Sequence, residues 1–208
     1  PNFPFYYGTS ACNGAGMTSR PNDVFDDLQR FIRAHGVEVK LEKMDVETPG
    51  AFDGPSITIN PVHDREASSY YLAHSFGSIY QWSTDFERAR NVFEDLRGAK
   101  NGAPQDFEPA LDAWRAFEET SSDHAVWVLG AIGHADAIDP YTVFFRADIE
   151  AMTIFHRTGK EPRWPDFFAE WKEKVATGEI QIEPFRPKPV ARFRPVRIEQ
   201  QEVLQERD

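Results

Sequence analysis

Apolar residues recur every three or four positions along most of the chain, which is the spacing of a helix with one buried face. The pattern predicts six helices, over residues 24–35, 67–84, 85–100, 108–129, 142–157 and 165–176. Residues 37–41 alternate apolar and polar side chains, and residues 56–60 are rich in β-branched ones, so both are predicted strands. A helix, two strands separated by a turn-rich stretch, and then further helices is the order of an α+β protein. We therefore expect a mostly helical α+β fold with a small N-terminal β-sheet.

The predicted helix over residues 67–84 differs from the others because it contains no Asp, Glu, Lys or Arg. A helix without charge on any face is typical of the middle of a domain. One of its faces carries Tyr70, Tyr71 and His74, which are candidate binding residues, and the opposite face is aliphatic and aromatic. Asp64 precedes the helix and is expected to cap it.

The C-terminal end of the chain has a different composition. Four prolines between residues 184 and 195 favour an extended backbone, and no acidic residue occurs between 184 and 197. We divide the chain into a single domain over residues 1–183 and an extended basic arm with a charged tail over 184–208. The arm is expected to lie on the acidic body of its own chain or of a neighbouring subunit in a homo-oligomer; phosphate binding is the alternative. Its basic residues are Arg186, Lys188, Arg192, Arg194 and Arg197.

Charge and composition narrow the class of protein. The 208 residues include 17 Phe, 5 Trp and 6 Tyr, which is globular composition, and the net charge is −11. Such a surface repels nucleic acid except at a concentrated basic segment, so the arm is the one expected contact with it. No apolar stretch is long enough to span a bilayer, and Cys12 is the single cysteine. We therefore expect a soluble protein of the reducing cytoplasm without a membrane partner; what preceded Pro1 stays open.

The string Leu-Ala-His-Ser-Phe-Gly-Ser over residues 72–78 resembles the active helix of the ImmA/IrrE-type metallopeptidases, which reads L-A-H-E-x-G-H. The elements that precede this string also resemble those that precede the motif in the family. They are a helix, the two strands, and Arg65-Glu66 just before the buried helix. The resemblance covers about residues 21 to 130. It implies a zincin-like core in which His74 matches the first zinc ligand.

The chain departs from the family motif at the positions that carry the chemistry. Ser75 occupies the position of the general base, and Ser78 occupies that of the second zinc ligand. A serine hydroxyl holds its proton too tightly to act as a base near pH 7, and it is a poor zinc ligand. The third ligand of the family is a Glu on a later helix, and the counterpart here is Glu119 or Thr120, depending on the register.

We therefore expect a degenerate H-E-x-x-H site: a metallopeptidase-like protein without cofactor that binds a peptide or protein and does not cleave it. In this interpretation His74 is a core residue, hydrogen-bonded to a neighbour such as Ser78. The alternative is a metal-dependent hydrolase with a zinc site rearranged around His74. That site would be completed by His63, Asp64, His124 or Glu119.

Overall fold

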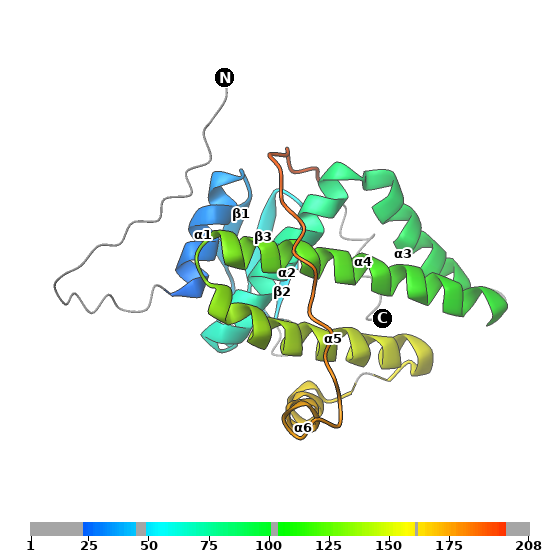
Figure 1. Cartoon of the computed structure of the whole chain (residues 1–208). Coiled ribbons are helices and arrows are strands. Elements are labelled where there is room, and N and C mark those ends of the chain that lie inside the picture. Colours follow the sequence, from blue (N-terminus) through cyan, green and yellow to red (C-terminus); the bar gives the residue numbers. More distant parts are fainter. Residues whose placement is uncertain (1–22, 45–48, 101–103, 161, 199–208) are drawn as a thin grey trace.

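The structure is a computed structural model that describes residues 23–44, 49–100, 104–160 and 162–198 (Figure 1). It confirms the α+β class, with a predominance of helix and one small sheet. The elements follow in the order α1 (Val24–Ala34), β1 (Glu38–Leu41), β2 (Gly50–Phe52), β3 (Ser56–Ile59), α2 (Arg65–Thr84), α3 (Phe86–Lys100), α4 (Pro104–Ala131), a 3-10 turn (Ala135–Ala137), α5 (Ile138–Thr158) and α6 (Trp164–Ala176). Within the described ranges, no helix combines the length and the apolarity needed to cross a bilayer.

The sheet has three strands in the order β1-β3-β2. The two predicted strands, β1 and β3, are parallel, and the unpredicted β2 pairs antiparallel with β3. β2 lies in the stretch that we interpreted as turns, because three residues are too short to show an alternating pattern. Among the described residues it is an edge strand, with β3 on one side only.

Acidic caps fix the beginnings of the first two helices. The Asp23 carboxylate accepts a hydrogen bond from the Phe25 amide at 3.0 Å, and the Asp64 carboxylate accepts one from the Ala67 amide at 2.8 Å, as predicted for Asp64. Arg65, the first residue of α2, binds the carboxylates of Asp23 and Asp26. The start of α1 is therefore tied to the start of α2.

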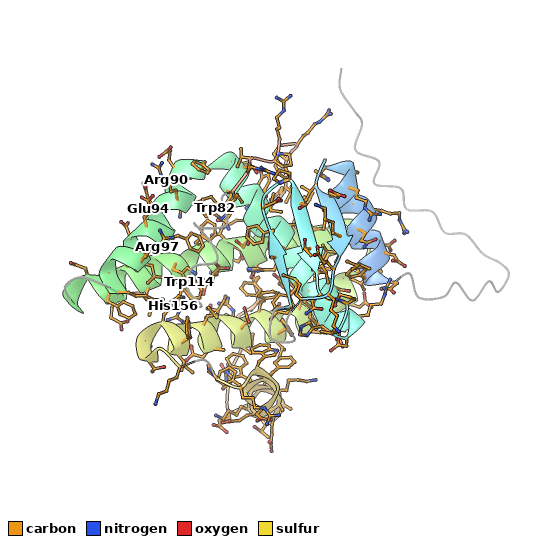
Figure 2. All side chains as sticks on the ribbon, turned by 180° about the vertical axis from the view of Figure 1, so that it is seen from behind. Trp82, Arg90, Glu94, Arg97, Trp114 and His156 are labelled. Atoms are coloured by element: carbon orange, nitrogen blue, oxygen red, sulfur yellow. The ribbon has the colours of Figure 1, made fainter. Side chains whose placement is uncertain are left out.

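The helix α2 lies in the core, as the absence of charge over its residues 67–84 predicts. Eleven of its 20 residues are buried, and the main core cluster includes Leu72, Phe76 and Ile79 from it. At its end, Trp82 contributes to a second cluster with Ala89 of α3 and Phe117 of α4 (Figure 2). α2 thereby connects the sheet side of the molecule to the α3–α4 pair.

α2 and α4 approach most closely at Gly77. A methyl group built on Gly77 would lie 2.1 Å from the backbone carbonyl oxygen of Ser121, which is far inside van der Waals contact. Only a residue without a side chain fits here. Gly98 in α3 gives the matched contrast, since a methyl group there would meet nothing within 4 Å.

The C-terminal segment, residues 181–198, contains neither helix nor strand and runs across α5 and α4 towards the sheet (Figure 1). Three of its apolar side chains, Phe185, Val190 and Ile198, are buried. Its backbone is bound to the body of the chain: the Asp123 carboxylate accepts from the Arg186 amide at 2.7 Å, and the Ile198 amide donates to the Asp53 carbonyl at 2.9 Å. This stretch therefore contributes to the core and covers α4.

The two glycines give opposite predictions for substitution by alanine. Gly77→Ala is expected to destabilise the fold by about 2 to 3 kcal/mol, because the methyl group forces α2 and α4 apart. Gly98→Ala is expected to stabilise it by about 0.5 to 1 kcal/mol, because alanine lowers the entropy cost of an exposed helix position. Urea unfolding of both variants measures this difference, and equal effects would contradict the close contact.

Candidate functional site

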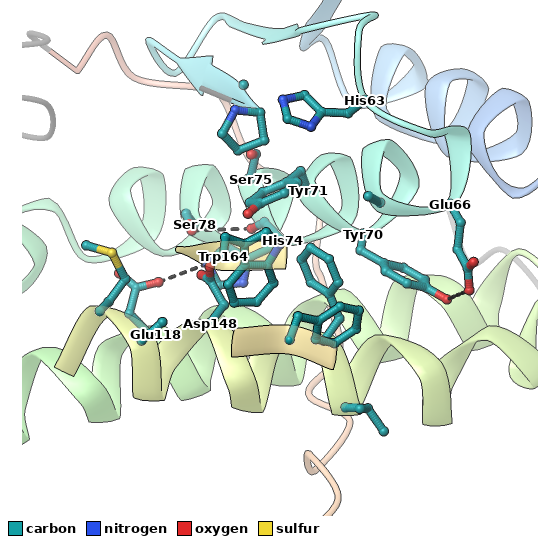
Figure 3. Close-up of a pocket in the computed structure, with 18 of the residues that line it drawn as sticks. His63, Glu66, Tyr70, Tyr71, His74, Ser75, Ser78, Glu118, Asp148 and Trp164 are labelled. Atoms are coloured by element: carbon teal, nitrogen blue, oxygen red, sulfur yellow. Dashed lines mark hydrogen bonds and ion pairs between the residues drawn. The ribbon is translucent and has the colours of Figure 1, made fainter. Parts of the chain in front are cut away.

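A cavity with a volume of about 1440 Å³ lies between α2, β2, α5 and α6, with one end reaching α4 (Figure 3). The predicted binding residues Tyr70, Tyr71 and His74 all line it. Much of the remaining wall is aromatic, from Phe52, Trp82, Phe93, Trp114, Phe117, Phe144, Trp164 and Phe168. A cavity of this kind buries an apolar ligand and leaves a few polar groups to orient it.

Both ring nitrogens of His74 have partners within the protein. Nε2 lies 2.9 Å from the Glu118 carboxylate, and Nδ1 lies 3.2 Å from the Ser122 hydroxyl and 3.3 Å from the Tyr141 hydroxyl. The imidazole also stacks on Phe145, with ring centres 4.1 Å apart and an interplanar angle of 13°. The ring is therefore fixed in position by contacts on both edges and on one face.

The environment of Tyr141 indicates how the proton on His74 is placed. Burial raises the pKa of Tyr141 well above its usual value, so its hydroxyl keeps its proton. That hydroxyl can donate to Nδ1 of His74, which leaves the ring proton on Nε2, where it faces the Glu118 carboxylate. In this arrangement both ring nitrogens of His74 have hydrogen-bond partners inside the fold.

The two serines of the degenerate motif have separate surroundings. Ser78 lies 3.1 Å from the Ser121 hydroxyl and 3.3 Å from the backbone carbonyl of His74. The expectation that Ser78 bonds the imidazole is therefore wrong, because its hydroxyl contacts the main chain of His74 instead. Ser75 is buried and lines the cavity.

The residue of α4 that faces His74 is Glu118, not Glu119 or Thr120. Glu119 binds Arg146 of α5 at 2.7 Å, and Thr120 donates to the Ala116 carbonyl at 2.9 Å. Successive residues of a helix are rotated by about 100°, so Glu119, one position after Glu118, points away from His74. The four-residue spacing of Glu118 and Ser122, which places both on one face, is the signal that could have found them.

The other predicted metal ligands lie apart from His74. His124 donates from Nδ1 to the Lys188 carbonyl at 2.9 Å, and its burial lowers its pKa. His63 lines the cavity at its β2 side, and its Nε2 is buried without a hydrogen-bond partner among the described residues. Within the described ranges, no three His, Cys, Asp or Glu side chains converge to hold a metal ion.

Two further histidines have structural positions. His134 lies 2.8 Å from the Asp27 carboxylate, and only 12% of its side chain is exposed. It joins the loop after α4 to α1. His156, near the end of α5, is buried with its ring 4.7 Å from that of Trp114 of α4 (Figure 2).

No family model, curated protein or solved structure matches the chain. The resemblance to the metallopeptidases therefore stays a prediction.

Removing the His74 ring should cost stability. His74→Ala removes the hydrogen bonds of the ring to Glu118, Ser122 and Tyr141 and opens a space against Phe145, so we expect a loss of about 1 to 3 kcal/mol in the free energy of unfolding. Urea denaturation measures it. Ser75→Ala, at the adjacent position, is the control and should change stability much less; equal losses would contradict the structural role of His74.

His156 should make the fold less stable in mild acid. Burial, with a contribution from Lys100, lowers its pKa from 6.5 to about 4. Between pH 6.5 and pH 4 the His156 imidazole is protonated in the unfolded chain and neutral in the folded chain. The free energy of unfolding is therefore not reduced by His156 above pH 6.5, and it decreases as the pH falls towards 4. The urea midpoint measured between pH 7 and pH 5 should fall less steeply for His156→Gln than for the unsubstituted protein. Parallel curves would contradict the assignment.

Proposed function

We propose that this chain is a metallopeptidase-like protein that has lost its zinc ligands and general base and now binds a peptide segment of a partner protein without cleaving it. The observation that carries the proposal is that the protein itself occupies both ring nitrogens of His74. Its ring is held by Glu118, Ser122, Tyr141 and Phe145, while a cavity of about 1440 Å³ lies beside it. The histidine supports the wall of a binding site.

The residues around His74 do not fit a zinc ion. A catalytic zinc site needs three protein ligands and a water molecule, with a base beside the water. His74 and Glu118 supply two potential ligands, and they bind each other. The remaining polar neighbours are the hydroxyls of Ser122 and Tyr141, and the pKa of the tyrosine is raised, which opposes formation of a phenolate ligand.

The length of the cavity supports a peptide ligand. Its α2 lining extends from Asp64 to Trp82, which is about 27 Å at the rise of 1.5 Å per helical residue. An extended peptide of about eight residues has this length. The volume is also above the range of about 300 to 1,000 Å³ that is usual for small-molecule sites.

The strand β2 supports the same proposal. All three of its residues, Gly50, Ala51 and Phe52, line the cavity, and β3 occupies one of its two sides. An edge strand can extend its ladder by hydrogen-bonding an extended peptide, while the cavity accepts alternate side chains.

We place the protein in the reducing cytoplasm, where a single unpaired cysteine stays reduced.

A cavity-blocked variant tests the proposal. Val143 of α5 is partly exposed and lines the cavity, so Val143→Trp should obstruct the cavity at α5 without disturbing the buried core. We expect a displayed library of eight-residue peptides to yield binders on the unsubstituted protein. The same binders should lose at least about tenfold in affinity for the variant. Circular dichroism and the unfolding midpoint check that the variant is folded.

Two outcomes would reject the proposal. One is the absence of any enriched peptide that distinguishes the unsubstituted protein from Val143→Trp. The other is about one tightly held zinc per purified chain together with peptide cleavage that a chelator abolishes, which would establish the alternative, a hydrolase with a rearranged site at His74.

A further inference from the structure

The C-terminal segment, residues 181–198, carries three exposed arginines where it reaches the sheet side of the molecule, namely Arg192, Arg194 and Arg197 (Figure 1). Among the described residues, their guanidinium groups form neither a hydrogen bond nor an ion pair. Lys188 of the same segment, in contrast, binds the Asp123 carboxylate at 2.9 Å. The acidic body of the chain thus pairs with Lys188 and leaves the charge of the three arginines open to an external ligand.

The lack of pairing does not come from a shortage of carboxylates. Asp and Glu number 34 in the chain, against 23 Lys and Arg. Other exposed arginines use them: Arg65 binds Asp23 and Asp26, and Arg157 binds Glu108 at 2.7 Å. The three arginines of the segment are therefore held away from the acidic side chains of the described body.

The backbone that carries these arginines is fixed on α2. The Phe193 ring packs against the rings of Phe76 and Tyr80, with ring centres 5.7 and 5.2 Å apart. The Val196 amide donates to the Ser83 hydroxyl at 3.2 Å. A ligand that binds the arginines orders their side chains and not the main chain, which lowers the entropy cost of binding.

The turn between β2 and β3 fixes the end of the row. Gly54 in this turn has a φ of +89°, and a methyl group built on it would lie 1.7 Å from the Val196 carbonyl oxygen. Only glycine combines this backbone conformation with the space for so close an approach. The position of Arg197, the next residue after Val196, is therefore set by the body of the protein.

The arginines form a row along the outer side of the segment. Alternate residues of an extended backbone point to opposite sides, so Arg192 and Arg194 lie on the outer side while Phe193 between them packs on the body. At about 3.1 Å per residue, Arg192 and Arg194 are about 6 Å apart, and Arg197 lies about 16 Å from Arg192 along the backbone. Since like charges repel, such a row suits a ligand that offers a separate anion to each guanidinium.

The acidic side chains near the end of the row are bound inside the fold. Asp53, whose carbonyl accepts the Ile198 amide, accepts hydrogen bonds through its carboxylate from the amide and the hydroxyl of Ser56 at 2.7 and 2.9 Å. Glu38 binds Lys40 at 3.3 Å. The three arginines therefore outweigh the negative charge beside them, although the net charge of the chain is −11.

We propose that Arg192, Arg194 and Arg197 bind the phosphate backbone of a single-stranded nucleic acid. Each guanidinium donates charge-assisted hydrogen bonds to one phosphate, a pairing for which the planar fork of arginine is well suited. The segment contains neither the helix nor the two-stranded ribbon that enters a duplex groove, so it follows a single backbone. None of the three arginines lines the cavity, and the site is independent of the proposed peptide binding.

The salt dependence of binding counts the phosphates that the row contacts. Fluorescence anisotropy with a labelled oligothymidine of about twelve nucleotides measures the affinity at several salt concentrations. Each phosphate neutralised on a single strand contributes about −0.7 to the slope of log affinity against log salt, so we expect about −2 for three arginines and about −1.4 for each single substitution by glutamine. The triple variant Arg192→Gln, Arg194→Gln, Arg197→Gln should lose at least about tenfold in affinity at low salt. Absence of binding, or a slope unchanged in the triple variant, would overturn the proposal.

Arg88→Gln is the matched control. Arg88 is an exposed arginine of α3 that also has no ion pair among the described residues, and its loss changes the net charge as much as each single substitution in the row does. It should leave the affinity and the slope unchanged, and the urea midpoint checks that every variant is folded. An effect equal to that of Arg194→Gln would show that only the net charge of the protein matters, which would overturn the site.

Other ligands of the row give different results. Polyglutamate with as many charges as the oligothymidine should bind at least about tenfold more weakly, since it lacks the phosphate geometry. Equal binding of polyglutamate, or tighter binding of duplex DNA, would overturn the assignment to a single strand. Sedimentation without nucleic acid covers the remaining case: a dimer that the triple variant converts to a monomer would assign the arginines to a second copy of the chain and reject the proposal.

Discussion

The contact between α2 and α4 at Gly77 determines the rest of the site. The missing side chain lets the backbone of Ser121 lie directly against α2. Because the helices meet there, side chains within one turn of the contact reach across the interface, and His74 bonds both Glu118 and Ser122. A larger residue at position 77 would separate the helices and break the His74 hydrogen bonds together with the packing.

Polar groups in the middle of a core are stable only when they bond one another, and the α2–α4 interface meets this condition. Ser78 bonds Ser121, and the Gln81 amide donates to the Phe117 carbonyl at 3.0 Å. With the His74 contacts, these bonds form a row along the interface. Ser78 and Ser121 are therefore suited to a structural role, since a hydroxyl is small enough for this close approach and can both donate and accept.

Much of the fold could be predicted from the sequence, because helix periodicity and charge are local properties. The absence of charge over residues 67–84 indicated the burial of α2, and Asp64 was recognised as its cap. β2 was missed because its three residues acquire their conformation from pairing with β3. Glu118 was missed because one residue of register decides which side chain faces His74, and that register depends on the contact at Gly77 rather than on local preference.

The C-terminal segment explains how the walls of the cavity stay in place. Asp123 and His124 lie on the side of α4 away from Glu118, and they bind the backbone of residues 186–188. α4 is therefore held between this segment on one side and α2 on the other. A wall fixed on both sides loses little conformational freedom when a ligand binds, so more of the contact energy is available as affinity. The proline-rich segment thus supports the cavity without lining it, because it holds the helix that carries Glu118.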